Sequence, residues 1–259
     1  MGTARRTYSL KKTALTLEPV GRGEAVAARG GPASSSTRDL LITTAERLFA
    51  EQGISVSNRQ IGEAAGQANN SVVGYHFGTR SDLVLAIVRR HALDIEQRRA
   101  VMLERVSRSK DLYAWLACLV MPVAAHLDSL GAPSWYARFL AQAVTDPAWR
   151  QVVFDETLAS PSMRATIEGI VCRLPVLPPE IHEERGDMTR HVILHACAER
   201  ERALQAGTPT PRATWEEAAL GMIDALVGLW SAPVRQTPSS KGASLNPTSP
   251  VDERRKDRK

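Results

Sequence analysis

The sequence predicts an all-α protein. Between residues 37 and 234, apolar residues recur at the three- and four-residue spacing of amphipathic helices, and alternating strand-like runs are almost absent. Ser, Thr, Asp or Pro stands at the start of nearly every such segment, as expected of helix amino termini. We therefore expect helices throughout 37–234, between two disordered basic tails at 1–36 and 235–259, which are too polar to offset the entropy of ordering.

The first four expected helices lie close together along the chain. They cover residues 37–52, 57–66, 70–77 and 79 to about 105, the last capped by Thr79 or Ser81. Ser57 and Gln60 have the spacing of a capping box, in which each side chain bonds a free backbone N–H at the helix start. Behind this box Ala64 and Ala65 are expected to let the next helix cross closely.

A capped helix, a glycine turn and a second short helix make up the layout of a helix-turn-helix. The second helix of such a unit fits the major groove of DNA, with its first residues at the base edges. The same layout also occurs as an ordinary helical corner, so by itself it leaves both interpretations open. Six more helices are expected in a second domain over 84–234, at 111–129, 134–145, 147–158, 162–172, 179–206 and 214–231.

The formal net charge of +5 comes from the two ends of the chain. Residues 1–36 hold six Lys and Arg against two Asp and Glu, and residues 235–259 hold seven against three. The segment 37–80 holds four of each sign, and 110–234 holds ten basic against fifteen acidic residues. Attraction to nucleic acid must therefore come from individually placed groups and from the tails.

Other classes of protein are disfavoured by what the sequence lacks. The three cysteines have neither CxxC nor CxxxC spacing, which argues against a disulfide framework and a zinc module. No apolar run approaches the roughly 20 residues of a membrane helix, and the apolar run after Arg5-Arg6 is too short for an export signal. We expect a cytoplasmic protein with no membrane partner, no cofactor and no metal.

The residues around the helix-turn-helix carry a more specific pattern. It reads Leu41-x3-Ala45-x2-Leu48-Phe49-x3-Gly53, then Ser57-x-Arg59-x-Ile61-Gly62-x-Ala64-Ala65-Gly66, then Tyr75-His76-Phe77 and Arg80-Ser81-x-Leu83. Together these sequence motifs resemble the amino-terminal DNA-binding domain of the TetR family of bacterial transcriptional regulators, over about residues 37–90. The stretch 67–74 is one residue longer than the common family pattern, which can shift assignments at Asn69, Asn70 and Ser71 by one.

The resemblance implies a set of DNA contacts. The residues concerned are Ser57, Arg59, Asn69, Asn70, Ser71, Gly74, Tyr75, His76 and Arg80. Ser57 would bind phosphate at a helix start, and Arg59 would reach guanine, although it can equally be a solvated helix charge. Asn70 and Ser71 would enter the major groove, while Asn69 can instead cap the helix.

The remaining contacts concern the end of the second helix and the start of the next. Gly74 stands where the family often has a larger side chain that touches DNA. Tyr75 and His76 resemble the pair that grips phosphate, although His76 can also be a neutral histidine at a helix end. Arg80 would clamp phosphate as a charged donor.

In the family, the second domain dimerises and often holds a small molecule. Tentative pocket residues are Trp115, Met121, Trp135, Phe139, Trp149 and His191, each of which can also be core or surface. Met188 and Val192 share a face of 179–206, and Trp215, Ala219, Met222, Leu226 and Leu229 form a heptad-like seam, which resembles the family's dimer helices. Asp187, His191 and His195 share a helix face but are expected to form a polar stripe, and His126 and His182 stand alone.

Three hypotheses follow. The first is a dimeric repressor released from a pseudo-palindromic double-stranded DNA operator by a small apolar effector. The second is a DNA-binding regulator that needs no ligand. The third, an all-helical enzyme, is disfavoured because no phosphate loop, nucleophile elbow or HExxH motif is present.

Overall fold

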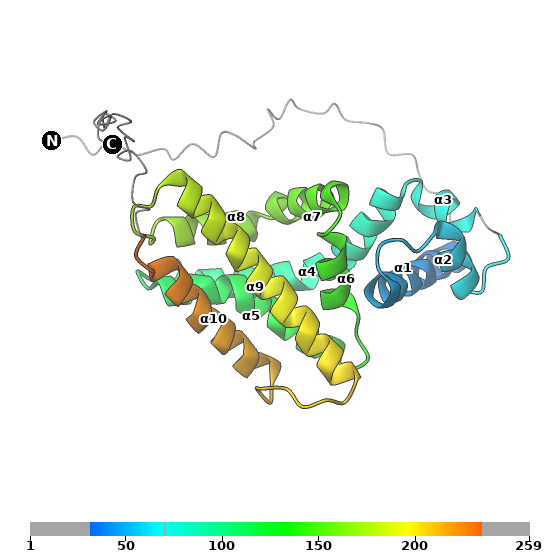
Figure 1. Ribbon diagram of the computed structural model, residues 1–259. Coiled ribbons are helices and arrows are strands. Elements are labelled where there is room, and N and C mark those ends of the chain that lie inside the picture. The colour runs from blue at the N-terminus through cyan, green and yellow to red at the C-terminus, as the bar shows by residue number, and fades with distance from the viewer. Residues whose placement is uncertain (1–31, 70, 235–259) are drawn as a thin grey trace, which may run out of the picture. The chain divides into compact units, whose positions relative to one another are not determined.

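The computed structural model describes residues 32–69 and 71–234, and its regular elements there are all α-helices (Figure 1). The predicted all-α class is confirmed. The chain divides into a short unit that ends at Asp39 and a compact unit that begins at Leu40, and the packing described below lies within the second. Most of the two predicted disordered tails lies outside the described residues. Residues 32–36, assigned to the first tail, instead belong to a helix, which begins at a proline as helices often do.

The amino-terminal helices are α1 (Pro32–Gln52), α2 (Asn58–Ala64), α3 (Val72–Phe77) and α4 (Arg80–Val106). The predicted capping box before α2 is present, because Ser57 N donates to Gln60 Oε1 at 2.8 Å and Gln60 N donates to Ser57 Oγ at 3.2 Å. A second box places Thr79, and not Ser81, as the cap of α4, with Asp82 as its partner. The short helix predicted over 70–77 is two residues shorter at its start.

Of the two small residues predicted to let α2 and α3 cross closely, Ala65 is buried and Ala64 is not, and Gly62 is the small residue that contacts α3. Ala64 is exposed, whereas Gly62 is buried against α3. A Cβ at position 62 would lie 3.3 Å from Val72 Cγ1 and 3.8 Å from the carbonyl oxygen of Asn69. The glycine therefore sets how closely the two helices approach, and the prediction for Ala64 was wrong because one helical step turned it to solvent.

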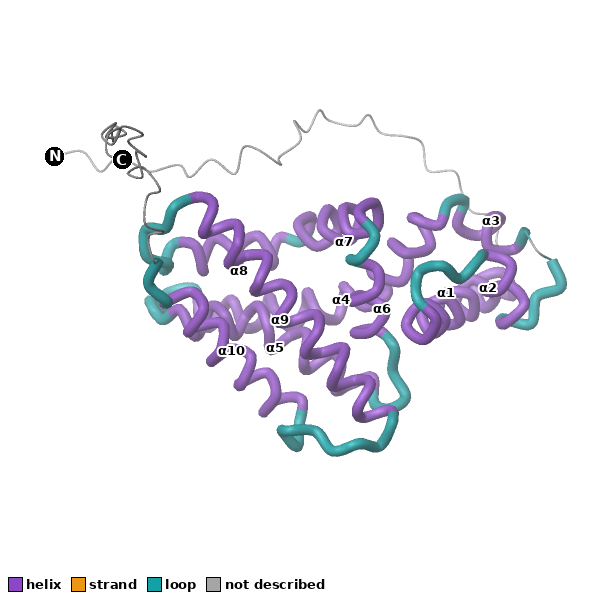
Figure 2. Tube along the Cα trace, viewed as in Figure 1, coloured by secondary structure: helices purple, strands orange, loops and turns teal. Residues whose placement is uncertain are grey.

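Six helices follow: α5 (Leu112–Leu130), α6 (Tyr136–Ala143), α7 (Pro147–Ala159), α8 (Pro161–Val171), α9 (Pro179–Gln205) and α10 (Trp215–Ser231). Asp111, Asp146, Ser160 and Thr214 cap four of them through their side-chain oxygens. Helix α5 packs against α4, α8 and α10, and α6 packs against α9 (Figure 2). The hydrophobic core continues from α1 into these helices, since the Phe49 ring lies 6.1 Å from that of Phe139 and 5.2 Å from that of Trp149.

Helix α5 is the described helix that is long and apolar enough to cross a membrane by length and composition alone. This corrects the expectation that no apolar run approaches that length. In the structure α5 is the central helix of the bundle, with Trp115, Leu116 and Val120 buried between its neighbours. Its apolar composition is accounted for by contacts on several sides.

The seam on α10 also has a different role from the predicted one. Trp215, Ala219, Met222 and Leu226 are at most 8% exposed, and α10 packs on α5 of the same chain. These four residues belong to the core of the single chain, so assigning them to contact with a second chain was wrong. A heptad stripe is equally suited to burial within one chain. Val192 and Leu229 are half-buried, and Met188 is exposed.

Candidate nucleic-acid interface

Helix α2 presents two charged side chains, Arg59 and Glu63, to solvent, and its cap bonds within the protein. The Ser57 hydroxyl, predicted to bind phosphate, is already engaged by Gln60, to which it also donates at 2.8 Å. Arg59 is exposed and pairs with Glu63 one turn later at 3.6 Å. Because such a surface pair contributes at most about 1 kcal/mol, the guanidinium can leave it for a DNA base or phosphate at little cost.

The turn between α2 and α3 is closed by an asparagine. Asn69 Oδ1 accepts a hydrogen bond from the backbone N–H of Ser71 at 2.9 Å, as in an Asx turn, while the cap position that the sequence offered to Asn69 is occupied by Ser71. Ser71 precedes α3 and is exposed, and its side chain makes no capping bond. Its hydroxyl is therefore not used to start the helix. Asn70, the other predicted groove residue, lies outside the described residues.

The outer face of α3 consists of Gly74, Tyr75 and His76. Gly74 is exposed, and a Cβ there would meet nothing within 4 Å, so this part of the helix surface is flat and open. Tyr75 is 79% exposed, and its ring stands edge-on to that of His76 at a centroid separation of 5.1 Å. The neighbours Val72, Val73 and Phe77 are buried and hold the helix on the core. The helix thus has a buried apolar side and an outward side on which Gly74 and Tyr75 are exposed and His76 is half-buried.

Arg80 is placed differently from the resemblance-based prediction of a phosphate clamp. Its Nη2 donates to the carbonyl oxygen of Ile54 at 2.7 Å, and its guanidinium carbon lies 5.5 Å and 5.3 Å from the ring centroids of Phe49 and Trp149. Burial lowers the pKa of this guanidinium, with Asp146 acting in the opposite direction. In this arrangement Arg80 joins the α1–α2 loop to α7 and does not point to DNA.

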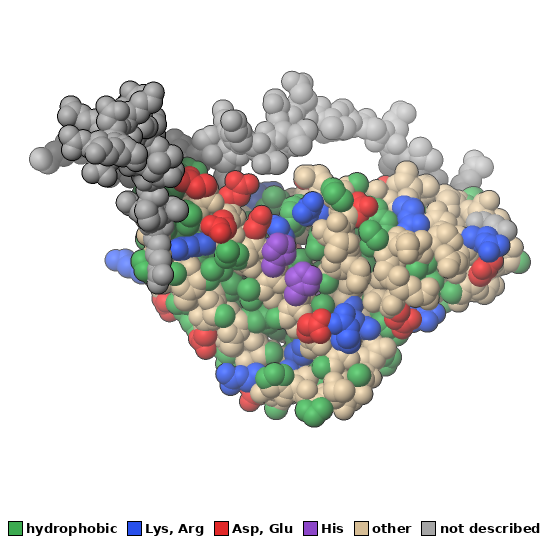
Figure 3. Space-filling model, in the orientation of Figure 1, with side chains coloured by type: hydrophobic (Ala, Val, Ile, Leu, Met, Phe, Trp, Pro, Cys, Tyr) green, Lys and Arg blue, Asp and Glu red, His purple; other side chains and the backbone are tan. Residues whose placement is uncertain are grey.

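No excess of one charge sign marks this end of the molecule. On the face drawn in Figure 3, Lys and Arg side chains are interspersed with Asp and Glu, and histidine side chains lie over α9. Contact with phosphate would then depend on a few directed donors, such as Arg59, the Tyr75 hydroxyl and His76, and on the tails.

The predicted pocket residues are dispersed among the helices. Trp115 is buried beside Gly169 and donates to the carbonyl oxygen of Ser109 at 3.1 Å. Phe139 and Trp149 pack on Phe49 and belong to the continuous core. The other three are less buried: Met121 is half-buried on α5, Trp135 donates to Glu51 at 3.2 Å, and His191 is exposed on α9, next to His195. Assigning His191 to an interior pocket was wrong, because its side of α9 faces solvent.

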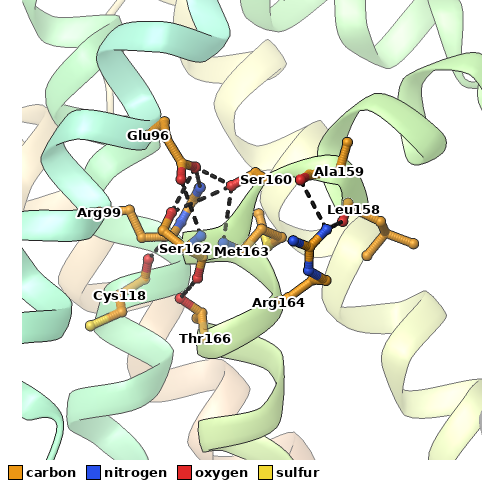
Figure 4. A network of polar contacts seen from close by, with 10 residues as sticks. All are labelled: Glu96, Arg99, Cys118, Leu158, Ala159, Ser160, Ser162, Met163, Arg164 and Thr166. Atoms are coloured by element: carbon orange, nitrogen blue, oxygen red, sulfur yellow. Dashed lines mark hydrogen bonds and ion pairs between the residues drawn. The ribbon is translucent and has the colours of Figure 1, made fainter. Parts of the chain in front are cut away.

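A polar network in the same domain joins α4 to the start of α8 (Figure 4). Glu96 accepts hydrogen bonds from the Ser160 hydroxyl and from both the hydroxyl and the N–H of Ser162. Burial alone would raise the pKa of Glu96, but these hydrogen bonds outweigh it and the pKa is lowered. Arg99, 3% exposed, lies 3.7 Å from Glu96 and donates to the carbonyl oxygen of Cys118 at 3.2 Å. We interpret this network as a structural link between the two helices.

Sequence reasoning missed one cluster altogether. His126, which appears isolated in the sequence, contacts His91 and Asp94, and His91 contacts Glu46. The partners of His126 lie 35 and 32 positions away, so no local spacing could have indicated them. From the sequence alone, His91 could be placed only on the inner side of the predicted helix, a position that suggested an ordinary core residue.

No family model matches the chain, and no curated protein matches it. Among solved structures, it is similar to a protein from Mesorhizobium loti MAFF303099 assigned to the TetR family of transcriptional regulators. The identity is 13% and the TM-score 0.39, and the match covers 77% of this chain and 98% of that chain. At these values the likeness says nothing about what the chain binds, and its function is inferred from its own residues.

Proposed function

We propose that this chain is a DNA-binding transcriptional regulator of the TetR family, acting as a dimeric repressor on a pseudo-palindromic operator. The observation that carries the proposal is the outward side of α3, where Gly74 and Tyr75 are exposed and His76 is half-buried, next to the exposed Ser71 and on a helix held at close distance by Gly62. A short helix that buries one side and exposes a row of hydrogen-bonding groups suits insertion into a major groove.

The test is binding to the DNA that flanks the chain's own coding sequence. We expect the wild-type protein to retard such fragments at low salt and to leave unrelated DNA of equal length mostly free. The double variant with Arg59→Ala and Tyr75→Ala should lose this preference, because it removes two exposed donors. A matched control changes Glu104→Gln and Arg108→Ala, which are exposed at and just after the end of α4, and should bind as the wild type does. Undiminished preference in the double variant would overturn the proposal.

We assign dimerisation to the exposed sides of α9 and α10 instead of the buried seam. On α10, Gly221 and Gly228 have nothing within 4 Å of where a Cβ would lie, Ala225 is exposed between them, and Leu220 is 40% exposed. Met188 on α9 is 41% exposed. Small residues let a partner helix approach closely, so Ala225→Arg should yield a monomer in light scattering. Retention of the wild-type mass by this variant would exclude this face.

A small apolar effector is the finer part of the proposal, and one observation favours the ligand-free alternative. Three of the predicted pocket residues are buried in contact with core neighbours and therefore do not line an open pocket: Trp115, Phe139 and Trp149. A thermal-shift screen of apolar metabolites separates the two regulators, because a ligand at 100 times its Kd should add about 2.7 kcal/mol of stability. A stabilising compound that also releases DNA supports the effector, whereas hits without DNA release contradict it.

A further inference from the structure

Four titratable side chains from three helices form a row, of which Glu46 and the two histidines are buried while the Asp94 side chain is 40% exposed. Glu46 lies on α1, His91 and Asp94 lie on α4, and His126 lies on α5. Glu46 Oε2 is 3.0 Å from His91 Nε2, His91 Nδ1 is 2.8 Å from His126 Nε2, and His126 Nδ1 is 2.7 Å from Asp94 Oδ2. Glu46 is 6% exposed and each histidine 5%. We call these four residues the histidine row.

The geometry of the histidine row determines how many protons it holds. Three contacts at hydrogen-bond distance need three hydrogens, one in each contact. Two neutral imidazoles supply two, so the third must come from one charged imidazole or from one protonated carboxyl group at either end of the row. In either arrangement the two histidines and two carboxylates together carry one negative charge. With fewer than three hydrogens, two lone pairs would face each other in one of the contacts. With more than three, two hydrogens would face each other.

One further proton changes the central contact. With both rings fully protonated, the N–H of His91 Nδ1 would point at the N–H of His126 Nε2, across a separation that is now 2.8 Å. Two cations and two hydrogens cannot stay at that distance, so the rings must separate. Glu46 and Asp94 would still attract the ring beside each of them. The break therefore falls between His91 and His126, which is between α4 and α5.

The surroundings oppose added positive charge. Arg98 on α4 pairs with Asp94 at 2.7 Å, and the buried Arg99 lies on the same helix. From α6, the ring of Tyr136 stacks on His91 at a centroid separation of 3.8 Å and stands edge-on to His126 at 5.8 Å. Burial raises the pKa of the Tyr136 hydroxyl, so Tyr136 provides no negative charge to compensate a second cation. Glu46 from α1 and Asp94 from α4 are the acidic groups that contact the rings.

We propose that the histidine row is a proton-operated lock between α4 and α5, opened when it takes up one proton more than its three contacts can hold. Its consequence rests on the proposed function, because α1 and α4 flank the helices that would bind DNA. In that setting the proton itself acts as an effector, and acidification releases the operator.

The pKa of His126 determines whether the stability contributed by the histidine row falls or rises as the pH is lowered. Burial lowers its pKa from the ordinary 6.5, partly countered by the hydrogen bond to Asp94. Below that ordinary value the unfolded chain binds this proton more readily than the folded chain does. The stability that the histidine row contributes is thus present above about pH 6.5 and is lost as the pH falls below it.

Hydrogen exchange of the full chain, without DNA, tests the lock. Peptides from the middle of α4 and from the middle of α5 should exchange about tenfold faster at about pH 5.5 than at about pH 7.5, after correction for the intrinsic chemical rate. In His126→Gln the amide can accept from His91 and donate to Asp94 but cannot take the extra proton, so the rates should change less than about twofold. His191→Gln removes an exposed histidine and should behave as the wild type.

Equal acceleration in the wild type and His126→Gln, or none in the wild type, would overturn the lock. If His126→Gln does not fold, ¹⁵N NMR of histidine in the wild type replaces it. We then expect both rings to become fully protonated over the same pH range in which exchange accelerates. Acceleration without that protonation would count against the proposal.

Binding to the operator fragment at constant ionic strength separates this inference from the proposed function. If DNA binding weakens at least tenfold on acidification in the wild type and not in His126→Gln, both stand. If exchange responds to pH as expected but no fragment is bound at either pH, the lock stands and the function as a DNA regulator fails. If the wild type binds DNA equally at both pH values and the protection of its α4 and α5 is unchanged, the function stands and the lock fails.

Discussion

The Nη2 atom of Arg80, in the first turn of α4, donates a hydrogen bond to the carbonyl oxygen of Ile54 at 2.7 Å. Ile54 belongs to the loop between α1 and α2, so this bond joins that loop to the long helix that leads into the second domain. Phe49 and Trp149 flank the guanidinium on the same side. A single side chain thereby connects the helix-turn-helix to α7.

Replacing Arg80 should affect stability more than phosphate contact. We expect Arg80→Ala to lower the free energy of unfolding by about 1.5–3 kcal/mol, the usual contribution of a hydrogen bond to a charged group, as measured in urea. The salt dependence of DNA binding should be unchanged. Arg59→Ala is the matched control, since Arg59 is exposed and should change the salt slope by about one without changing stability. The reverse pattern for the two variants would restore Arg80 as a phosphate clamp.

The contact between Gly169 and Trp115 predicts a large effect from a single methyl group. A Cβ at position 169 of α8 would overlap the six-membered ring of Trp115, which is itself 7% exposed. Gly169→Ala should therefore cost about 1–3 kcal/mol or more by overpacking, in thermal or urea unfolding. Gly186→Ala on α9, where nothing lies within 4 Å, should stabilise by up to about 1 kcal/mol. Equal effects at the two glycines would contradict the packing of α8 on α5.

The buried Glu201 should be among the most sensitive positions of the second domain. It is 1% exposed, and its oxygens accept from Ser134 Oγ, from the backbone N–H groups of Ala137 and Arg138, and from Arg138 Nε at 3.1 Å. Glu201→Ala leaves a buried guanidinium without its carboxylate and should cost about 3–5 kcal/mol. The exposed pair of Glu199 and Arg202 provides the control, and Glu199→Ala should cost less than about 1 kcal/mol.

The three cysteines should differ in reactivity. Burial raises the pKa of Cys197 to about 12 and also raises that of Cys118, so neither thiol is ionised near neutral pH. Cys172 is exposed at the end of α8. Iodoacetamide at about pH 8 should modify Cys172 alone in the folded chain and all three in urea, as read by peptide mass spectrometry. Labelling of Cys197 under native conditions would show that α9 opens locally.

Contacts between residues close together in the sequence could be predicted from their spacing. Contacts between residues far apart in the sequence could not. The boxes at Ser57 and Thr79 connect residues three apart, so the sequence alone shows both partners. The bond from Arg80 to Ile54 spans 26 positions and the contact of His91 with His126 spans 35, and neither leaves a periodic signal. The sequence also does not show which partner covers an apolar helix face, because the apolar stripe on α10 has the same spacing whether α5 or a second chain covers it.

The candidate DNA surface was predictable to a similar extent. Tyr75 and His76 follow the motif and lie on the exposed side of α3, and Arg59 is exposed on α2. Whether a given polar atom remains available to DNA depends on its neighbours in space and not on its identity. The Ser57 hydroxyl is already hydrogen-bonded to Gln60, and the side-chain oxygen Oδ1 of Asn69 is already hydrogen-bonded to the backbone N–H of Ser71.

The contact between Gly62 and Val72 makes the orientation of α3 independent of the length of the turn before it. Since a Cβ at position 62 would come within 3.3 Å of Val72, the two helices are already as close as side chains permit. An inserted residue in the turn must bulge outward near Asn69, because no space remains for α3 to shift. The length of this turn can then change while α3 keeps its angle to α2.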